Sequence, residues 1–303
     1  MGSRELPFYQ VDAFSSEAFS GNPAAVILLD DSSYISDSQR QSIAAENNLA
    51  ETAYVVPHPE YLTKEGDPFQ ACSHFSLRWF TPAVEVPMCG HATLASAAVL
   101  FKEKCNASPV LFFHTLSGVL EVTQQLEMSL PLCNPTDPVP QSCQNVSGPF
   151  AHACSGGLPV SEIAYAASSG LNYVLVRLVP GTSRQHLESM KPDLQAMQEA
   201  VASESAGSVR GVIVTTSGDG YDVLSRFFAP WLGVPEDHVT GSAHSALAPY
   251  WQARLPGIKD GRSMAARQCS SRGGDLMLRV DSVGNKVVVS GHAVIVIKGT
   301  MFL

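Results

Sequence analysis

The pattern of apolar and polar residues predicts a chain in which short strands alternate with a few helices. Two-residue alternation and clusters of β-branched and aromatic residues are typical of strands, and turn residues separate them. Residues 36–47 place N-cap residues ahead of good helix formers, which predicts a helix. In the first half, strands are predicted at residues 8–14, 25–29, 52–56, 75–80, 111–114 and 119–123.

Residues 91–104 are rich in alanine and carry almost no charge before Lys102. A helix that is apolar on all sides belongs inside a core rather than on a surface. The second half repeats this plan, with an inner helix at 241–253 and a further helix at 192–203, where Pro192 suits the first turn. Strands are predicted there at residues 173–178, 212–216, 223–228, 276–280 and 287–297. Gly21-Asn-Pro23 is a turn signal, and the proline-rich stretch 131–140 is the best candidate for a linker.

An internal repeat relates the two halves. Arg78-Trp-Phe-Thr-Pro-Ala-Val-Glu-Val-Pro87 aligns without gaps on Arg226-Phe-Phe-Ala-Pro-Trp-Leu-Gly-Val-Pro235, with five of ten positions identical. After a three-residue insertion, Cys89-Gly-His-Ala92 pairs with Thr240-Gly-Ser-Ala243, and each opens a helix of small residues. A repeat of this length indicates two copies of one structural unit.

The repeat predicts an α+β fold of two pseudo-symmetric halves, each a β-sheet or barrel wrapped around a central helix. We expect an N-terminal half at residues 1–130, with the C-terminal strand as a candidate addition, and a C-terminal half at 131–303. If the two inner helices face each other across a cleft, their N-termini would bind a small anionic molecule, because exposed N–H groups and the helix dipole favour negative charge.

Composition and charge exclude several function classes. Apolar residues make up 45% of the 303 residues and charged residues 16%, as in compact soluble proteins. The net charge of −9 argues against nucleic-acid binding, and no apolar run reaches the ~20 residues of a membrane span. Seven irregularly spaced cysteines form neither a disulfide framework nor a zinc pattern. With no signal peptide, we predict a cytoplasmic protein without a metal.

Glu51 is the first candidate for chemistry. It lies at a predicted helix-to-strand joint, in Asn48-Leu-Ala-Glu-Thr-Ala-Tyr54, among few other charges. A carboxylate held among apolar neighbours has a raised pKa, which suits a general acid–base near neutral pH. The competing interpretation is an exposed loop glutamate, and the repeat offers no acidic counterpart in the second half.

The first helix start, Pro87-Met-Cys-Gly-His-Ala92, offers three further candidates. Gly90 lets backbone N–H groups approach a ligand closely. The field of the helix disfavours a charged His91, which predicts a neutral hydrogen-bond partner or proton shuttle. Cys89 is either a reactive thiol, since a helix N-terminus favours the thiolate, or a buried spectator. For His91, too, the alternative interpretation is a purely structural role.

The second helix start, Val234-Pro-Glu-Asp-His-Val-Thr-Gly-Ser-Ala-His244, offers the matching set. Asp237 occupies the usual place of a capping carboxylate. Thr240, Gly241 and Ser242 supply two hydroxyls and free N–H groups, again a cradle for an anion. Each of these is a routine cap when taken singly, but as repeat-mates of Cys89-Gly-His91 they indicate a shared substrate site.

The chain resembles the PhzF-like, or phenazine biosynthesis-like, isomerase family, and in particular its animal branch. The resemblance runs almost from end to end. The matching segments are Gln10-Val-Asp-Ala-Phe14, Phe19-Ser-Gly-Asn-Pro-Ala-Ala-Val26, Asn48-Leu-Ala-Glu-Thr52, Arg78-Trp-Phe-Thr-Pro82, Cys89-Gly-His-Ala-Thr93, Phe228-Ala-Pro230 and Glu236-Asp-His-Val-Thr-Gly-Ser-Ala243.

This resemblance implies a diaminopimelate-epimerase-like fold, no cofactor and a homodimer. In the phenazine enzymes a glutamate moves a proton between carbons of trans-2,3-dihydro-3-hydroxyanthranilate, and the resemblance assigns that role to Glu51. It assigns supporting catalytic roles to His91, Asp237 and Ser242. Substrate binding, including the substrate carboxylate at the two glycines, falls to Asn22, Cys89, Gly90, Thr240 and Gly241.

Two departures from the family pattern bear on the mechanism. Racemases and epimerases of this fold use two opposed thiols, but Thr240 stands where the second thiol would be, and a hydroxyl is far too weak an acid to replace it. His244 replaces an asparagine of the family. The sequence therefore predicts a cofactor-independent isomerase acting through Glu51. The alternatives are a racemase or epimerase built on Cys89, and a non-catalytic interaction protein that keeps the fold.

Overall fold

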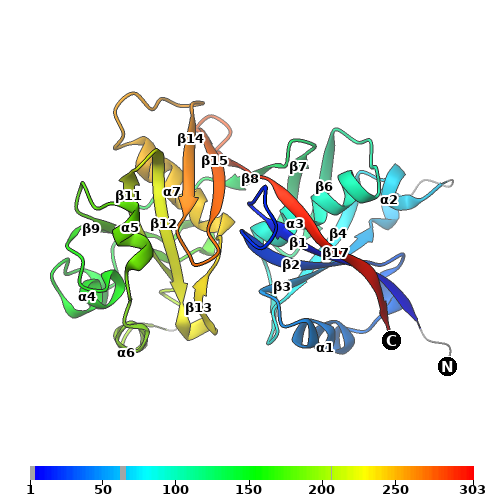
Figure 1. The fold of residues 1–303 in the computed structure, drawn as a ribbon, viewed down its shortest axis with the longest axis horizontal. Helices are drawn as coiled ribbons and strands as arrows, with labels where there is room; N and C mark the ends of the chain where they lie inside the picture. The colour runs from blue at the N-terminus through cyan, green and yellow to red at the C-terminus, as the bar shows by residue number, and fades with distance from the viewer. Residues whose placement is uncertain (1–3, 62–65, 206) are drawn as a thin grey trace. The chain divides into compact units, whose positions relative to one another are not determined.

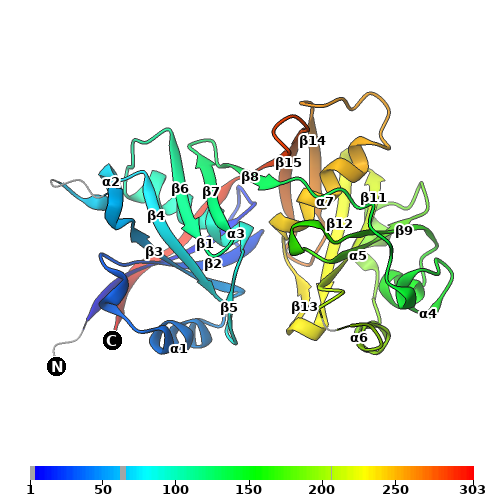
Figure 2. The same ribbon diagram turned by 180° about the vertical axis from the view of Figure 1, so that it is seen from behind.

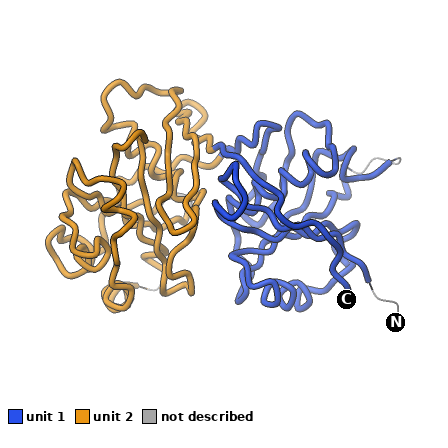
Figure 3. Tube along the Cα trace, in the orientation of Figure 1, with its two compact units in different colours: residues 1–129, 290–303 blue, residues 130–289 orange. Residues whose placement is uncertain are grey.

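The computed structural model describes residues 4–61, 66–205 and 207–303. The chain divides into two compact units, coloured separately in Figure 3. Unit 1 comprises residues 1–129 and 290–303, and unit 2 comprises residues 130–289. Both chain ends belong to unit 1, where the backbones of Arg4 and Leu303 hydrogen-bond to each other.

Unit 1 is a twisted sheet with one helix buried against it (Figures 1 and 2). Its strands are β1 (Glu5–Ala13), β2 (Asn22–Leu28), β3 (Glu51–Pro57), β4 (His74–Phe80), β5 (Glu85–Val86), β6 (Val110–Thr115), β7 (Gly118–Thr123) and β17 (Ala293–Phe302). They pair in the order β17-β1-β2-β3-β4-β6-β7, parallel at β2–β3 and β4–β6 and antiparallel elsewhere, while β5 adds to β4. The helices are α1 (Asp37–Asn47), α2 (Pro68–Ala71) and α3 (Gly90–Ala98).

Helix α3 is the buried centre of unit 1. All nine of its residues are buried, and it packs against β1, β2, β3 and β17. Its small side chains allow this close approach, which confirms the predicted inner helix. The helix ends differently from the prediction, because residues Val99–Glu103 continue it as a π-helix before the chain turns away.

Helix α1 confirms the predicted start signal. Ser36 is its N-cap and forms a capping box with Gln39, so that two backbone N–H groups at the helix start are satisfied by side chains. The helix ends at Asn48, whose left-handed backbone (φ 50°) redirects the chain into β3. This short connection determines where Glu51 lies.

Unit 2 repeats the sheet of unit 1. Its strands are β9 (Val160–Ala166), β10 (Tyr173–Leu178), β11 (Gly211–Gly218), β12 (Tyr221–Ala229), β13 (Val234–Asp237), β14 (Ser263–Gln268), β15 (Gly274–Asp281) and β16 (Lys286–Ser290), and β8 (Glu127–Pro131) spans the boundary between the units. The order β9-β10-β11-β12-β14-β15 reproduces β1-β2-β3-β4-β6-β7 with the same strand directions. The helices are α4 (Pro149–Ser155), α5 (Arg184–Ser189), α6 (Leu194–Ala202) and the buried α7 (Gly241–Gln252). The predicted α+β repeat is therefore confirmed.

Three local predictions are wrong. The single strand expected at residues 287–297 is two strands, β16 and β17, which belong to different units. Helix α6 begins at Leu194 with Asp193 as its N-cap, so Pro192 precedes the helix instead of lying in its first turn. Of the turn signal, only Gly21 turns the chain (φ 70°), and Asn22 already begins β2. The proline-rich segment 132–140 carries no regular helix or strand.

Several elements had no usable signal in the sequence, among them α4, α5, β9 and β14. They are short, and their apolar residues gain a pattern only when the core of unit 2 is assembled. Within the part of the chain that the structure describes, no helix is both long and apolar enough to cross a membrane.

Candidate active site

Glu51 is the first residue of β3, where its backbone pairs with Ala24 of the parallel strand β2. Its side chain is 18% exposed, so it is neither free in solvent nor fully buried. The predicted alternative of an exposed loop glutamate is therefore wrong. A partly enclosed carboxylate at a strand end can still exchange protons with a ligand.

Four predicted residues meet around the start of α3. The Glu51 carboxylate oxygen Oε2 lies 3.1 Å from Nε2 of His91, and Nδ1 of the same ring lies 3.5 Å from Sγ of Cys89. The amide nitrogen Nδ2 of Asn22 lies 3.1 Å from that Nδ1 atom. Gly90 begins the helix between Cys89 and His91. Unit 1 thus gathers a carboxylate, an imidazole, a thiol and an amide in one cluster.

Burial and charge act in opposite directions on this cluster. Burial, together with the negative charge of Glu51, raises the pKa of the Cys89 thiol to about 11, so Cys89 is a neutral thiol at pH 7. Burial lowers the pKa of His91, but its acidic neighbours Cys89 and Glu51 raise it well above the ordinary value. This direction opposes the helix field, which favours the neutral imidazole.

The hydrogen bond between Asn22 and His91 corresponds instead to a neutral imidazole. With Nδ2 of Asn22 as donor, Nδ1 must be an acceptor, and the ring is then neutral with its proton on Nε2. An imidazolium needs an acceptor at Nδ1, which the Asn22 amide provides once it turns to present Oδ1. The Glu51 carboxylate favours the imidazolium in either amide orientation. Protonation of His91 is thus coupled to the orientation of Asn22.

The contact between Glu51 and His91 leaves unused hydrogen-bonding capacity. Although Oε2 and Nε2 are 3.1 Å apart, neither atom makes an aligned hydrogen bond within the described chain, and both atoms are buried. Buried polar atoms are almost always paired in native structures. The contact is therefore an ion pair rather than an aligned hydrogen bond.

The second predicted set lies at the start of α7. Asp237 ends β13, and its carboxylate accepts a hydrogen bond of 2.6 Å from the Thr240 hydroxyl. Thr240, not Asp237, is the N-cap residue. The Thr240 N–H is not free as expected, because it donates to Oε1 of Gln268 at 2.8 Å, and Nε2 of Gln268 donates to the Asp237 carbonyl at 2.7 Å. Gln268, on β14, therefore holds this segment in place.

Ser242 and His244 occupy the first turn of α7. The Ser242 hydroxyl lies 3.0 Å from the hydroxyl of Tyr173, a residue of β10. Helix geometry leaves the N–H groups of Gly241 and Ser242 without an intrahelical partner. His244 is fully buried and donates from Nδ1 to the Thr240 carbonyl at 2.8 Å, and burial lowers its pKa to about 4. His244 is therefore a neutral imidazole at pH 7.

Sequence reasoning missed Gln268 and Tyr173. Both reach the start of α7 from strands that are distant in sequence, β14 and β10. Nothing in their local pattern distinguishes them from other strand residues. Only the pairing of strands within unit 2 brings them to the helix.

The structure refines the internal repeat. Arg78 donates to Glu85 from Nε at 2.7 Å and from Nη2 at 2.8 Å, and Arg226 donates to Glu236 with the same two distances. Glu85 therefore corresponds to Glu236. The three-residue insertion lies before this glutamate, in the turn Pro230–Leu232, and not after Pro235 as the sequence alignment has it.

Strand pairing identifies the counterpart of Glu51. Thr52 pairs with Phe80, and Val212 pairs with Phe228, which is the repeat-mate of Phe80. Glu51 thus corresponds to Gly211. A Cβ atom at Gly211 would lie 2.3 Å from the ring of Phe227, so the aromatic ring fills the space that a side chain would need. Unit 2 has no place for a second carboxylate at this position.

Each unit also has an equivalent hydrogen bond at the start of its inner helix. The Thr93 hydroxyl donates to the Cys89 carbonyl at 2.5 Å, and Nδ1 of His244 donates to the Thr240 carbonyl at 2.8 Å. His244 thus takes over the role of its repeat-mate Thr93 and adds a second ring nitrogen, Nε2. That atom is buried and has no hydrogen-bond partner among the described residues.

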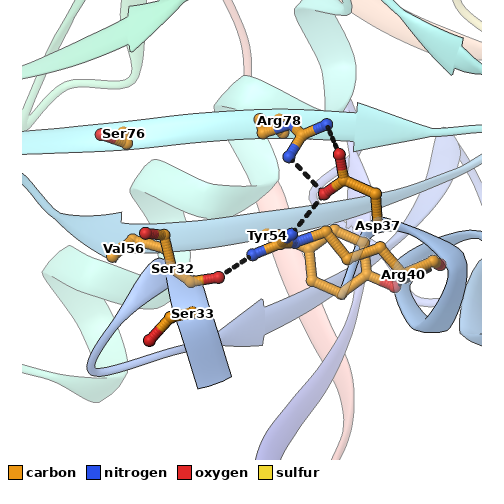
Figure 4. Close-up of a pocket in the computed structure, with 8 residues that line it drawn as sticks. All are labelled: Ser32, Ser33, Asp37, Arg40, Tyr54, Val56, Ser76 and Arg78. Carbon is orange, nitrogen blue, oxygen red and sulfur yellow. Dashed lines mark hydrogen bonds and ion pairs between the residues drawn. The ribbon is translucent and has the colours of Figure 1, made fainter. Parts of the chain in front are cut away.

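Two hollows within the units lie elsewhere. One, of about 280 Å³, lies beside Arg40 and Arg78, and Figure 4 shows both guanidinium groups directed at Asp37. The other, of about 230 Å³, lies at Arg226, the repeat-mate of Arg78. The guanidinium groups of Arg78 and Arg226 are already bound to carboxylates, Asp37 and Glu85 in one case and Glu236 in the other. Their recurrence in both units indicates a structural feature of the repeat.

Comparisons with known proteins agree with this fold. The family model described as phenazine biosynthesis-like protein matches residues 11–299. The chain is 42% identical to phenazine biosynthesis-like domain-containing protein 2 of Mus musculus, covering 98% of this chain and 99% of that protein. It is 40% identical to a Pseudomonas aeruginosa protein named as an uncharacterized isomerase, covering 99% of each chain.

Solved structures give the same result. The crystal structure of a PhzF-family protein from Enterococcus faecalis matches with a TM-score of 0.78 and 36% identity, covering 99% of this chain and 100% of that one. A hydroxyproline epimerase from Agrobacterium vitis shares the fold alone, with a TM-score of 0.59 at 12% identity. The family match spans nearly the whole chain, and apart from Gln10 the motifs that carry the resemblance lie within it. The chain therefore belongs to the PhzC-PhzF family of phenazine biosynthesis-like proteins.

Proposed function

We propose that this protein is a cofactor-independent isomerase that moves a proton between two carbons of a small carboxylate-bearing substrate. Membership of the PhzF-like family, and the isomerase name of the Pseudomonas aeruginosa relative, support an isomerase or epimerase. The observation that carries the finer proposal is the pair of buried, incompletely hydrogen-bonded atoms Oε2 of Glu51 and Nε2 of His91.

In this mechanism Glu51 is the general acid–base. Its carboxylate takes a proton from an activated carbon as that C–H bond breaks, and the electron pair shifts through the adjacent double bond. The protonated Glu51 then returns the proton to the second carbon, where the new C–H bond forms. His91 orients the carboxylate between the two steps, and Asn22 orients His91.

A single base favours transfer on one face of the substrate. The counterpart of Glu51 is Gly211, and the counterpart of Cys89 is Thr240, so unit 2 has no acid of comparable strength at either of these two positions. In our proposal Glu51 both removes the proton and returns it. This asymmetry supports an isomerase over a racemase with two opposed bases.

We assign the residues at the start of α7 to the same reaction. The Asp237 carboxylate, which accepts a hydrogen bond from the Thr240 hydroxyl while Gln268 holds the Asp237 main-chain carbonyl, would bind a polar group of the substrate. Ser242 with Tyr173 would bind another. The N–H groups at the start of α7, at Gly241, are assigned to a negatively charged group of the substrate, because the helix dipole favours negative charge there. The assignment rests on the family resemblance together with this local geometry.

The test is proton exchange followed by NMR in D₂O. Wild-type protein is incubated with trans-2,3-dihydro-3-hydroxyanthranilate, and deuterium entry at the substrate carbons is measured. Glu51→Gln keeps the size of the side chain and should slow exchange by about 10²- to 10⁴-fold, the usual contribution of a general acid–base. Glu46→Gln removes the same charge from an exposed position on α1 and should leave the rate unchanged.

Exchange at the wild-type rate in Glu51→Gln would refute the assignment of Glu51. If wild-type protein binds the compound without exchange, the same machinery acts on another carboxylate. If wild-type protein neither binds the compound nor catalyses exchange, the result favours the alternative of a non-catalytic interaction protein. Folding of each variant is checked by circular dichroism so that loss of activity is not confused with loss of structure.

An epimerase built on Cys89 is the second candidate. The 3.5 Å contact between the thiol and His91 favours it, since the neutral form of the imidazole can accept the thiol proton. Loss of exchange in Cys89→Ser with retention in Glu51→Gln would select this mechanism, with an α-hydrogen of an amino acid as the proton to follow.

We also propose a homodimer, a cytoplasmic location and activity without a cofactor. Light scattering on the purified protein tests the first, and a monomer at micromolar concentration would contradict it. Fluorescence of a tagged copy in cells tests the second. Retention of activity after dialysis against a chelator, with no chromophore in the absorption spectrum, tests the third.

A further inference from the structure

Three side chains of unit 1 offer donor atoms of the kind that bind a transition metal. Glu51, Cys89 and His91 present a carboxylate oxygen, a thiol sulfur and an imidazole nitrogen that all lie within 4.8 Å of one another. Cys89 and His91 are buried, whereas Glu51 is 18% exposed and leaves one side of the group accessible. Proton transfer by Glu51 does not by itself require a thiol at this point.

The spacing fits a tetrahedral metal. Zinc bonds of about 2.3 Å to sulfur and 2.0–2.1 Å to nitrogen place the two ligand atoms about 3.5 Å apart. The observed distance between Sγ of Cys89 and Nδ1 of His91 is 3.5 Å. One ligand atom from each of the three residues lies within 4.8 Å of the other two, so an approach of at most about 1.5 Å by the flexible Glu51 side chain completes three ligands.

The donor set also selects the kind of metal. A thiolate with an imidazole and a carboxylate suits Zn²⁺ or Cd²⁺, while Mg²⁺ and Ca²⁺ prefer sites made of oxygen alone. The charges of the Glu51 carboxylate and the Cys89 thiolate would balance those of a divalent cation. A fourth position stays open for water.

We propose that Glu51, Cys89 and His91 form a binding site for a soft divalent cation of the Zn²⁺ class, and that the bound cation blocks the site. The metal–sulfur bond forms as the S–H bond of Cys89 breaks, and the proton leaves to solvent. An imidazolium at His91 releases a second proton as its nitrogen binds the metal. No oxidation or reduction takes place.

The bound cation coordinates the Glu51 carboxylate, which is then no longer available for proton transfer. Inhibition therefore rests on the function proposed above, but binding does not, because it follows from the three donor atoms alone. A binding measurement without substrate keeps the two questions separate. Failure of the isomerase proposal would leave this binding result unaffected.

A second group of histidines requires a control. His74 and His114 lie with Nδ1 and Nε2 3.0 Å apart, and the ring of His58 is 4.3 Å from that of His114. His74 lies on β4 and His114 on β6, and His58 directly follows β3. Imidazoles so close together also attract transition metals, so binding must be assigned to one group or the other.

The experiment is calorimetric titration of the metal-free full-length protein with ZnCl₂, repeated with CdCl₂ while thiolate–cadmium absorption is recorded in the ultraviolet. Wild type should bind one cation with proton release and develop this absorption. Cys89→Ala should weaken that binding by about 100-fold or more, as expected for loss of a thiolate ligand. Glu51→Gln should weaken it to a smaller extent and still show the absorption.

Two control variants should bind as the wild type does. Cys105→Ser removes the exposed thiol, and the His74→Phe/His114→Phe double variant removes the histidine pair. Equal affinity in wild type and Cys89→Ala, with both folded by circular dichroism, would overturn the proposal. So would binding that is lost in the histidine double variant and kept in Cys89→Ala. If isomerase activity is found, ZnCl₂ should inhibit it reversibly, with chelator restoring the rate.

Discussion

The buried imidazole of His244 should make the stability of unit 2 depend on pH. Burial lowers the pKa of His244 to about 4, whereas an unfolded chain binds this proton with a pKa near 6.5. Between these values the unfolded state binds more protons than the native state, so stability rises with pH. The contribution is fully present above about pH 6.5 and is lost as the pH falls through 4.

The size of the effect follows from the two pKa values. Their difference corresponds to about 3 kcal/mol at the acid limit, at 1.36 kcal/mol for each pH unit. Between pH 7 and pH 5 the loss is about 2 kcal/mol, because only part of that range lies below 6.5. An effect of this size shifts a urea midpoint by an easily measured amount.

The perturbation is His244→Thr, which copies its repeat-mate Thr93. The threonine hydroxyl of that residue already donates to the carbonyl four residues earlier, so the variant can keep the bond to Thr240 while removing the titrating ring. Urea unfolding is followed by the fluorescence of Trp251, which is buried on the same helix. The advantage of wild type over the variant should shrink by about 2 kcal/mol from pH 7 to pH 5.

A control separates this effect from general acid destabilisation. His152→Thr removes an exposed histidine from the same unit and should follow the wild-type curve. A wild-type-to-His244→Thr difference that stays constant over this pH range would refute the reasoning. It would mean that the folded protein admits the proton to His244 at little cost.

Two further predictions concern the repeat. Arg226→Ala should destabilise the protein by about 3–5 kcal/mol, because it leaves Glu236 and two backbone carbonyls of a buried site without their donor. Arg78→Ala, at a side chain that is 33% exposed, should cost about 1 kcal/mol, and equal urea midpoints for the two variants would contradict this difference. Gly211→Ala should cost about 1–3 kcal/mol, since its Cβ meets the Phe227 ring at 2.3 Å, and an unchanged melting temperature would show that the ring yields freely.

Local sequence patterns were enough to predict the repeating strands and the two inner helices. Helix α3 is recognisable because an alanine-rich, nearly uncharged stretch has no stable place except a core. Helix α1 is recognisable because Ser36 and Gln39 satisfy its first N–H groups from within the same turn. Such signals are local, and they survive without knowledge of any distant residue.

The candidate site divides along the same line. The sequence singled out Asn22, Glu51, Cys89 and His91, and the structure brings these four into one cluster. The sequence did not reveal that the pKa of His91 is raised, because Glu51, which raises it together with Cys89, is distant in sequence and becomes a neighbour only when α3 packs against β3.

In unit 2 the tertiary structure decided even more. Gln268 and Tyr173 reach the start of α7 through strand pairing, and the match of Gly211 with Glu51 depends on which residues face each other across two strands. A strand residue has the same local pattern whichever partner it meets, and a shift of one position turns its side chain to the other face of the sheet. The sequence by itself thus determined the elements and their twofold repetition, while tertiary packing decided the register, the charges that act on each titrating group and the absence of a second carboxylate at Gly211.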